Sequence, residues 1–181
     1  MNGSGGTNFC SMEITNSTIS GNFAMGNGGG VYGPADLNNV TIGGNEATAS
    51  GSGIYAIGGG PLPMFLQNSI LASNPGGNCN TTTFSISQGY NLSSDSTCTL
   101  GSAGDLNNTD PELGNLTKNG GPTQTMALLP GSPAIDAGNP AGCTDGHGHV
   151  LPTDQRGDRR PGDPKLTTGC DMGAYEVQFP K

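Results

Sequence analysis

A seven-residue phrase recurs along the first half of this chain and restricts the folds that the chain can adopt. It reads NSTISGN at 16–22, NVTIGGN at 39–45 and, more loosely, NSILASN at 68–74. The first two copies start 23 residues apart, and the third starts 29 residues later. Self-similarity at such a period indicates a solenoid, in which each unit buries its apolar face against neighbouring units.

Aligning the three copies gives columns of chemically similar residues. The two apolar columns are five positions apart, and on a straight strand an odd separation would put them on opposite faces. Both can face one core only if the chain bends between them, where a column of Asn lies. Asn tolerates left-handed backbone, and stacked Asn amides can hydrogen-bond from one unit to the next. The apolar columns are Ile14, Leu37, Leu66 and Ile19, Ile42, Leu71; the Asn columns are Asn16, Asn39, Asn68 and Asn22, Asn45, Asn74.

These columns predict an all-β fold, a right-handed parallel β-helix built from short strands and sharp corners. The composition agrees, because 33 of the 181 residues are Gly, none is Trp and only 5% are aromatic. Such a composition also fits a disordered chain, but disorder would not keep Ile and Leu in register. We expect β-helix turns over residues 1–118 and an irregular C-terminal cap, continuous with them, over residues 119–181.

The charge and hydropathy of the chain exclude two classes of partner. The net charge is −8 with only six Lys and Arg, so the basic cluster of a nucleic-acid surface is missing. No segment approaches the roughly 20 apolar residues of a membrane span. The N-terminal residues, MNGSGGTNFC, lack the charged and apolar regions of a signal peptide and read as the middle of a repeat. We therefore expect the C-terminal part of a longer secreted or cell-surface protein, whose signal and anchor segments lie outside this chain.

The five cysteines follow no zinc-site spacing, because the sequence has no CxxC pair. An exterior rich in Asn, Thr and Gly and poor in Lys indicates an extracytoplasmic setting, in which disulfides persist. Proximity in sequence favours Cys79–Cys98 and Cys143–Cys170 and leaves Cys10 over. A free buried thiol is the alternative for each of them.

Several phrases in the last third of the chain occur together in a known group of proteins. They are DPELG at 110–114, NGGPTQTMALLPGSPAIDAG at 119–138, TDQRGDRRP at 153–161 and CDMGAYE at 170–176. Over about residues 105–177 the chain resembles the C-terminal region of bacterial choice-of-anchor Q proteins. The phrases NSTISGN and GGGVY are similar, less specifically, to the repeats of pectate-lyase-like and polymorphic outer-membrane solenoids. The resemblance implies a right-handed β-helix that is secreted or surface-attached in bacteria, and it implies no single activity.

The segment TDGHGHVLPTD, at 144–154, holds the only two histidines of the protein. On an extended segment Asp145, His147 and His149 would project to one side. One carboxylate and two imidazoles can bind zinc or another transition metal. These three residues are the candidate metal ligands, and together with Asp154 they are the candidate catalytic residues. The alternative is a mobile loop, because Gly146 and Gly148 need not hold ligands in place.

Carboxylates are frequent in the C-terminal half, and oxygen-rich loops suit calcium better than zinc. Paired acids with Arg or calcium can also serve as a base or nucleophile and stabilise an oxyanion. The carboxylates concerned are Asp105, Asp110, Glu112, Asp136, Asp154, Asp158, Asp163 and Asp171.

Four residues of the C-terminal region are interpreted as structural. Asp154, Arg156 and Arg160, in TDQRGDRRP, are expected to form an ion-pair and hydrogen-bond lock that holds the cap to the last turn. Arg suits this role because its planar guanidinium binds carboxylates and carbonyls through two hydrogen bonds at once. Asp136, in AIDAG, is expected to accept backbone N–H bonds at a turn.

Two functions remain open at this point. The first is a secreted or cell-surface β-helix module that binds calcium and presents an elongated face to an extracellular polymer or partner. The second is a metal-dependent hydrolase or lyase that acts on carboxylic esters, lactones or glycans in a shallow groove. Serine-nucleophile, phosphate-loop and dinucleotide motifs are missing from the sequence.

Overall fold

The computed structural model describes residues 11–57, 62–80, 85–162 and 169–179. Within these residues every regular element is a β-strand. The first turns of the chain contain β1 (Met12–Ser20), β2 (Phe23–Ala24), β3 (Val31–Tyr32), β4 (Ala35–Gly43), β5 (Glu46–Ala47) and β6 (Ile54–Tyr55). They are followed by β7 (Met64–Gln67), β8 (Ile70–Ala72), β9 (Ser85–Ser87), β10 (Leu92–Ser93), β11 (Leu113–Thr117) and β12 (Thr125–Leu128).

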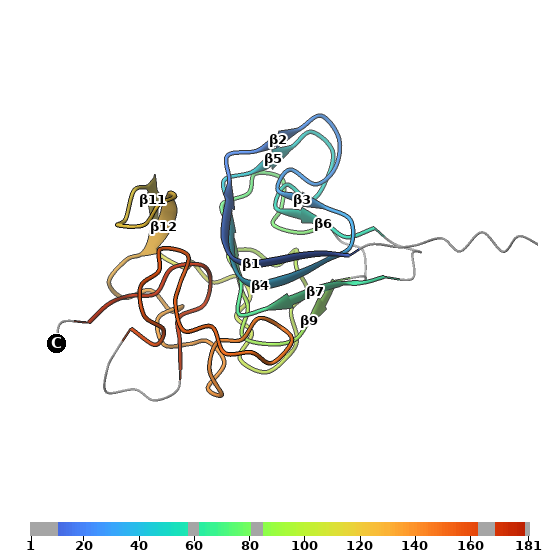
Figure 1. The fold of residues 1–181 in the computed structure, drawn as a ribbon. Helices are drawn as coiled ribbons and strands as arrows, with labels where there is room; N and C mark the ends of the chain where they lie inside the picture. The colour runs from blue at the N-terminus through green and yellow to red at the C-terminus, as the bar shows by residue number, and fades with distance from the viewer. Residues whose placement is uncertain (1–10, 58–61, 81–84, 163–168, 180–181) are drawn as a thin grey trace, which may run out of the picture.

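The strands stack as a parallel β-solenoid of about three turns, which confirms the predicted fold class (Figure 1). The strand β4 pairs in parallel with β1 on one side and with β7 and β8 on the other. The short strands β2 and β3 stack in the same way on β5 and β6, 23 residues further along the chain. The first two turns therefore each contribute one long bent strand and two short ones, and in the third turn β7 and β8 take the places of the two halves of the long strand.

The long strands bend at the Asn column, as the sequence predicts. The φ angles are 46° at Asn16, 55° at Asn39 and 53° at Asn68. Left-handed backbone in the middle of a nine-residue strand turns the chain sharply. Tyr90 takes the corresponding place in the next turn, also with a positive φ of 59°.

The bend divides the sheet into two arms, which we name by their place in each turn. The first arm holds the strand halves before the Asn column, together with β7 and β9. The second arm holds the halves after it, together with β8 and β10. Because of the bend, Leu37 in the first arm and Ile42 in the second both point into one core and are fully buried. The predicted columns are confirmed, since Leu37 pairs with Ile14 and Leu66, and Ile42 with Ile19 and Leu71.

The second Asn column forms a ladder of amides at the corner of the solenoid, exposed at Asn22 and buried from Asn45 onward. The Nδ2 of Asn22 donates to Oδ1 of Asn45, Asn45 donates to Asn74, and Asn74 donates to Asn78, over 2.9, 3.1 and 2.9 Å. The Nδ2 groups of Asn45 and Asn74 also bond the carbonyls of Ile19 and Ile42. A corner closed by side-chain amides satisfies polar groups that a buried turn would otherwise leave unpaired.

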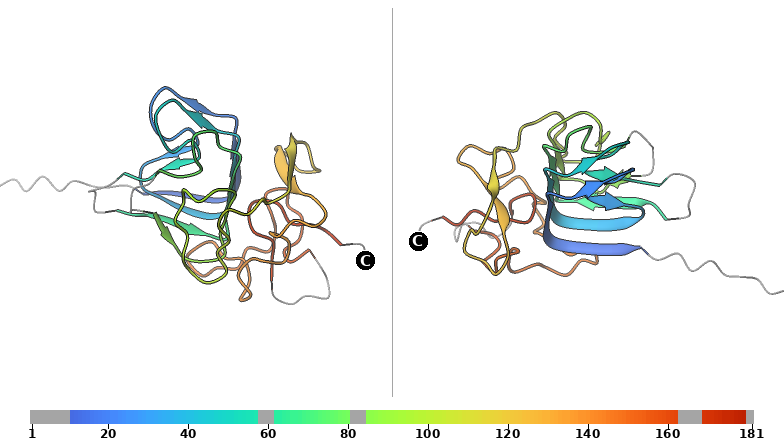
Figure 2. Two further views of the ribbon diagram at one scale, coloured as in Figure 1. Left: turned by 180° about the vertical axis from the view of Figure 1, so that it is seen from behind. Right: turned by 90° about the horizontal axis from the view of Figure 1, so that it is seen from above.

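Beyond the last turn, β11 and β12 pair as an antiparallel hairpin. The residues that follow, 129–162 and 169–179, form an irregular C-terminal segment. It lies along the flank of the solenoid, beside the bend (Figures 1 and 2). Its Ala134 and Met172 form a second core with Ile70, Ala72 and Leu92, on the outer face of the second arm.

The C-terminal segment therefore covers one side of several turns. The prediction was different: a cap held to the last turn alone. The backbone N–H of Ala174 bonds the hydroxyl of Thr41 in β4, and Gly173 N–H bonds the carbonyl of Asn68. The physical reason is the outer face of the second arm, where Ile70 and Ala72 are apolar and must be buried. The outer face of the first arm carries mostly polar residues, and one loop of the C-terminal segment reaches over it.

Candidate functional site

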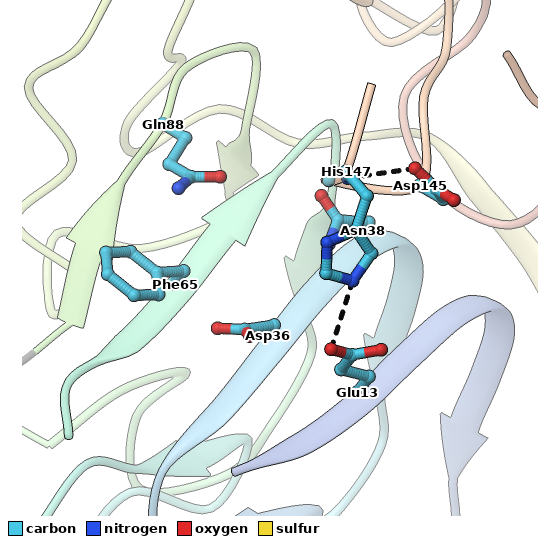
Figure 3. A pocket seen from close by; sticks show the side chains of 8 residues that line it. Glu13, Asp36, Asn38, Phe65, Gln88, Asp145 and His147 are labelled. Carbon is cyan, nitrogen blue, oxygen red and sulfur yellow. Dashed lines mark hydrogen bonds and ion pairs between the residues drawn. The ribbon is translucent and has the colours of Figure 1, made fainter. Parts of the chain in front are cut away.

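A pocket lies on the outer face of the first arm, at the place where the C-terminal segment reaches over it (Figure 3). We call it the lateral pocket; its cavity is about 150 Å³. The residues that line it are Glu13, Asp36, Asn38, Phe65, Gln88, Asp145, Gly146 and His147.

The floor of the lateral pocket is built by the period-two alternation of the first arm. In β4, Leu37 points into the core, so its neighbours Asp36 and Asn38 point outward. Register then places Glu13 of β1 and Phe65 of β7 on either side of Asp36. Figure 3 shows the Asp36 side chain extending across the sheet toward Phe65. Adjacent parallel strands are about 4.8 Å apart, so these side chains are direct neighbours.

The wall of the lateral pocket is a loop of the C-terminal segment that is folded around Asp145. The Oδ1 of Asp145 accepts the backbone N–H groups of His147 and His149, and Nδ1 of His149 lies 2.7 Å from Oδ2. The bond from the His149 ring, together with these two backbone bonds, lowers the pKa of Asp145 to about 2. Asp145 therefore stays ionised over the physiological range and organises the loop.

Contacts through His147 and Gly146 help to hold this loop against the first arm. The Nε2 of His147 lies 3.0 Å from Oε1 of Glu13, with both side chains more than half exposed. Gly146 sits directly on Asn38, since a Cβ at Gly146 would come within 2.6 Å of the Asn38 Nδ2. Gly146 also has a φ of 84°, which other residues rarely adopt. A glycine is thus required for the loop to approach the sheet this closely.

Two acceptor atoms in the floor of the lateral pocket are buried and have no hydrogen-bond partner in the described structure: Oδ1 of Asp36 and Oδ1 of Asn38. Asn38 as a whole is only 4% exposed. Burial and the nearby charge of Glu13 raise the pKa of Asp36, although His147 acts in the opposite direction. An unpartnered buried acceptor is costly, so this site is poised for a ligand that donates hydrogen bonds or carries positive charge.

The three candidate metal ligands, Asp145, His147 and His149, do not converge on one point in the structure. His149 turns back onto Asp145, whereas His147 points to Glu13. Across the described ranges, no group of three or more His, Cys, Asp or Glu is placed to hold a metal ion. The physical reason is that Asp145 accepts the backbone N–H groups of its own loop, which curls the segment that was expected to be extended.

Asp154, the fourth candidate catalytic residue, lies away from the lateral pocket in a buried ion-pair network. Its Oδ2 is 2.8 Å from Nη2 of Arg156, and it accepts the backbone N–H groups of Asp158 and Glu176. The guanidinium of Arg156 also lies 3.6 Å from the centre of the Tyr175 ring. The side chains of Asp154 and Arg156 are almost fully buried, so the pair lies inside the C-terminal segment.

Arg160 joins the C-terminal segment to the solenoid. Its Nη1 bonds Oε2 of Glu176 at 2.7 Å with both side chains 1% exposed, and its Nη2 bonds Oδ1 of Asn16 at 3.3 Å. Asn16 belongs to β1, the first described turn, whereas the lock was expected at the last turn. The N–H of Asp136 donates to Oδ1 of Asp171; the predicted acceptor role of Asp136 stays a prediction.

The other carboxylates of the C-terminal half are dispersed and engaged in local bonds. Asp105 accepts from the hydroxyl of Ser87 and from backbone N–H groups of Asn91 and Ser102. Asp110 accepts the N–H of Glu112, and Asp163 lies outside the described residues.

Sequence reasoning missed the residues that form the floor of the lateral pocket. A signal was present, because Glu13, Asp36 and Phe65 each stand immediately before a member of the first apolar column. In a strand that position must face outward. Glu13, Asp36 and Phe65 could therefore have been identified as an outward-facing stripe with two carboxylates and one aromatic ring.

Both predicted cysteine pairs are confirmed. Cys79 and Cys98 form a disulfide with a Cα–Cα separation of 4.8 Å, and Cys143 and Cys170 form one with a separation of 5.9 Å. The second disulfide lies beside the bend, where Nδ2 of Asn68 contacts both sulfur atoms. Cys10 lies outside the described residues.

No family model, curated protein or solved structure matches this chain. In the described ranges, no helix has the length and apolar character needed to cross a membrane.

Proposed function

We propose that this chain belongs to a secreted or cell-surface β-helix module that binds an extracellular polymer in the lateral pocket. The observation that carries the proposal is the pair of unpartnered acceptor atoms, Oδ1 of Asp36 and Oδ1 of Asn38, in the pocket floor. A polymer with hydroxyl or amino groups supplies the hydrogen-bond donors that these atoms lack.

The shape of the solenoid supports a polymer as the ligand. Successive turns repeat the outer face of the first arm, so a chain laid across them meets a new strand about every 4.8 Å. Phe65 offers an apolar ring surface beside Asp36, and Gln88 adds an amide at the edge of the pocket. An apolar surface with a few well-placed polar groups is typical of ligand sites.

The proposed location outside the cytoplasm is supported by the two disulfides, which persist in oxidising compartments. The resemblance to choice-of-anchor Q proteins in bacteria agrees with this location. We include calcium in the proposal as an ion that the pocket oxygens bind, because carboxylate and amide oxygens are its preferred ligands.

The test is co-sedimentation with insoluble polysaccharides that differ in charge, in the presence of calcium and of a chelator. We expect the wild-type protein to sediment with at least one of them and the Phe65→Ala protein to lose this binding. Gln88→Ala, at an exposed position, repeats the test without removing a packed side chain. The control is Phe23→Ala, because Phe23 is 60% exposed on β2, away from the pocket. Binding to none of the polymers, or equal binding by all variants, would overturn the proposal.

One observation favours a second function, hydrolysis of a glycan or ester. Asp36 has a raised pKa next to Glu13, and two carboxylates with different environments can act as acid and base. The test is a panel of chromogenic glycosides, esters and lactones, with calcium, zinc or a chelator added. Turnover by the wild type that is lost in Asp36→Asn would support hydrolysis, and turnover that persists in Asp36→Asn would contradict it.

A further inference from the structure

We propose that the lateral pocket selects the protonated amino group of an amino-sugar polymer over neutral and acidic glycans. This inference rests on the proposed function, because it names the class of polymer that the same pocket binds. It follows from the charge of the pocket, its hydrogen-bonding capacity, its aromatic ring and its size.

The charge of the lateral pocket is negative. Three carboxylates line it, those of Glu13, Asp36 and Asp145, against two imidazoles: that of His147 in the lining and that of His149, 2.7 Å from Asp145. The whole chain carries a net charge of −8, so no distant surplus of cations offsets them. An acidic polymer would meet repulsion here, whereas a cation would be attracted.

The hydrogen-bonding groups of the pocket floor also favour an ammonium group. The two unpartnered atoms, on Asp36 and Asn38, are both acceptors. An ammonium group has three donors and no acceptor, so every one of its bonds can be used. A hydroxyl donates once and brings lone pairs of its own, which this floor does not need.

The aromatic ring beside Asp36 is a further feature that suits a cation. Phe65 is the register neighbour of Asp36 and lines the same pocket (Figure 3). Aromatic faces attract ammonium groups through the ring quadrupole. Phe65 therefore complements the carboxylates, and its ring also offers an apolar surface to the sugar ring that carries the amine.

The cavity limits what can enter it. A cavity of about 150 Å³ is small beside the roughly 300–1,000 Å³ of pockets that hold a whole drug-sized ligand. This is room for an ammonium substituent with part of its sugar ring, and the rest of the polymer must lie across the outer face of the first arm. An amine that projects from every sugar unit meets this requirement.

The test is isothermal titration calorimetry with three soluble oligomers of equal length: glucosamine, N-acetylglucosamine and galacturonate. The measurements are made at a mildly acidic pH, where the amine is protonated, and repeated at higher salt. We expect the wild type to bind the glucosamine oligomer about tenfold or more tightly than the N-acetylglucosamine oligomer, since hydrogen bonds to charged groups are stronger than those between neutral groups.

Two isosteric variants identify the group responsible. Asp36→Asn should lose about tenfold in affinity for the glucosamine oligomer. Glu46→Gln removes the same charge from an exposed position on β5 and should bind as the wild type does. The melting temperature of Asp36→Asn should not fall, because the change removes a charge whose ionisation is disfavoured in the folded state.

The outcomes separate this inference from the proposed function. Equal affinity for the glucosamine and N-acetylglucosamine oligomers would overturn the amine preference and leave polymer binding standing. Equal affinity of Asp36→Asn and the wild type for glucosamine would also overturn it, because attraction to the acidic chain as a whole would then explain the binding. Tighter binding of galacturonate would reverse the preference. Binding of none of the three oligomers would overturn the amine preference, and co-sedimentation with the wider set of polysaccharides would then decide whether polymer binding stands.

Discussion

The Nδ2 of Asn68 donates a 3.0 Å hydrogen bond to Oδ1 of Asn39, the residue at the same position one turn earlier. Both residues are buried, and both hold a left-handed backbone, with φ angles of 53° and 55°. One residue type therefore performs two tasks at the bend. It permits the backbone angle that brings both apolar columns into one core, and it links adjacent turns through its side chain.

Replacing Asn39 separates these two tasks. Asn39→Gly keeps the backbone angle but loses the side-chain bonds, including the one from Nδ2 to the carbonyl of Thr144. Asn39→Ala loses those bonds and must also hold Ala in the left-handed region, which adds about 1–2 kcal/mol. We expect urea denaturation to show that Ala destabilises more than Gly. A Gly variant no more stable than the Ala variant would show that the backbone angle contributes little.

The core columns predict an unequal cost of truncation. Ile42 is fully buried between neighbouring turns, whereas Ile19 at the same position in β1 is only partly buried. Ile42→Ala should reduce the free energy of unfolding by about 2–5 kcal/mol, and Ile19→Ala by less. Chemical denaturation measures both values. An equal loss at the two positions would contradict the assigned packing.

The ion pair between Arg160 and Glu176 predicts a large effect at one of two adjacent arginines. Arg160→Met leaves the buried carboxylate of Glu176 without its cation, which should cost about 3–5 kcal/mol. The control is Arg159→Met, because Arg159 is exposed. The measurement is the melting temperature of the two variants. Similar small changes in both would show that the contact with Asn16 and Glu176 does not stabilise the fold.

Asp171 predicts the direction in which stability changes with pH. Burial, together with the nearby Glu176, raises the pKa of Asp171 from 3.8 to about 7. Between these values the folded state binds a proton that the unfolded state has released, so stability falls as pH rises from about 4 to 7. The raised pKa of Glu176, caused by burial, acts in the same direction. We expect the melting temperature to be several degrees higher at pH 5 than at pH 7.5. A melting temperature that rises across this interval would contradict the assignment.

The solenoid was predictable from the sequence, and so was the outward-facing stripe that forms the floor of the lateral pocket, but the closing of that pocket by a distant loop was not. The bend at Asn39 and the burial of Leu37 and Ile42 follow from a local repeat, in which each turn constrains the next. The pocket combines Glu13 with His147, which are 134 residues apart, and no repeat relates them. Their meeting depends on how an irregular segment packs against the apolar second arm. Asp145 shows the same limit, because the backbone bonds that it accepts decide whether the two histidines converge.

The most direct test of the central claim is the pKa of Asp36, measured by carbon-detected NMR titration of its carboxyl group with and without glucosamine oligomer. In the free protein the pKa lies above the ordinary 3.8, because the carboxylate is partly buried and lies beside Glu13. A bound ammonium group stabilises the ionised form, so we predict that saturation with the oligomer moves this pKa down. A pKa of Asp36 that stays unchanged at saturation, while Glu13 or distant carboxylates shift instead, would show that the amine does not occupy the lateral pocket.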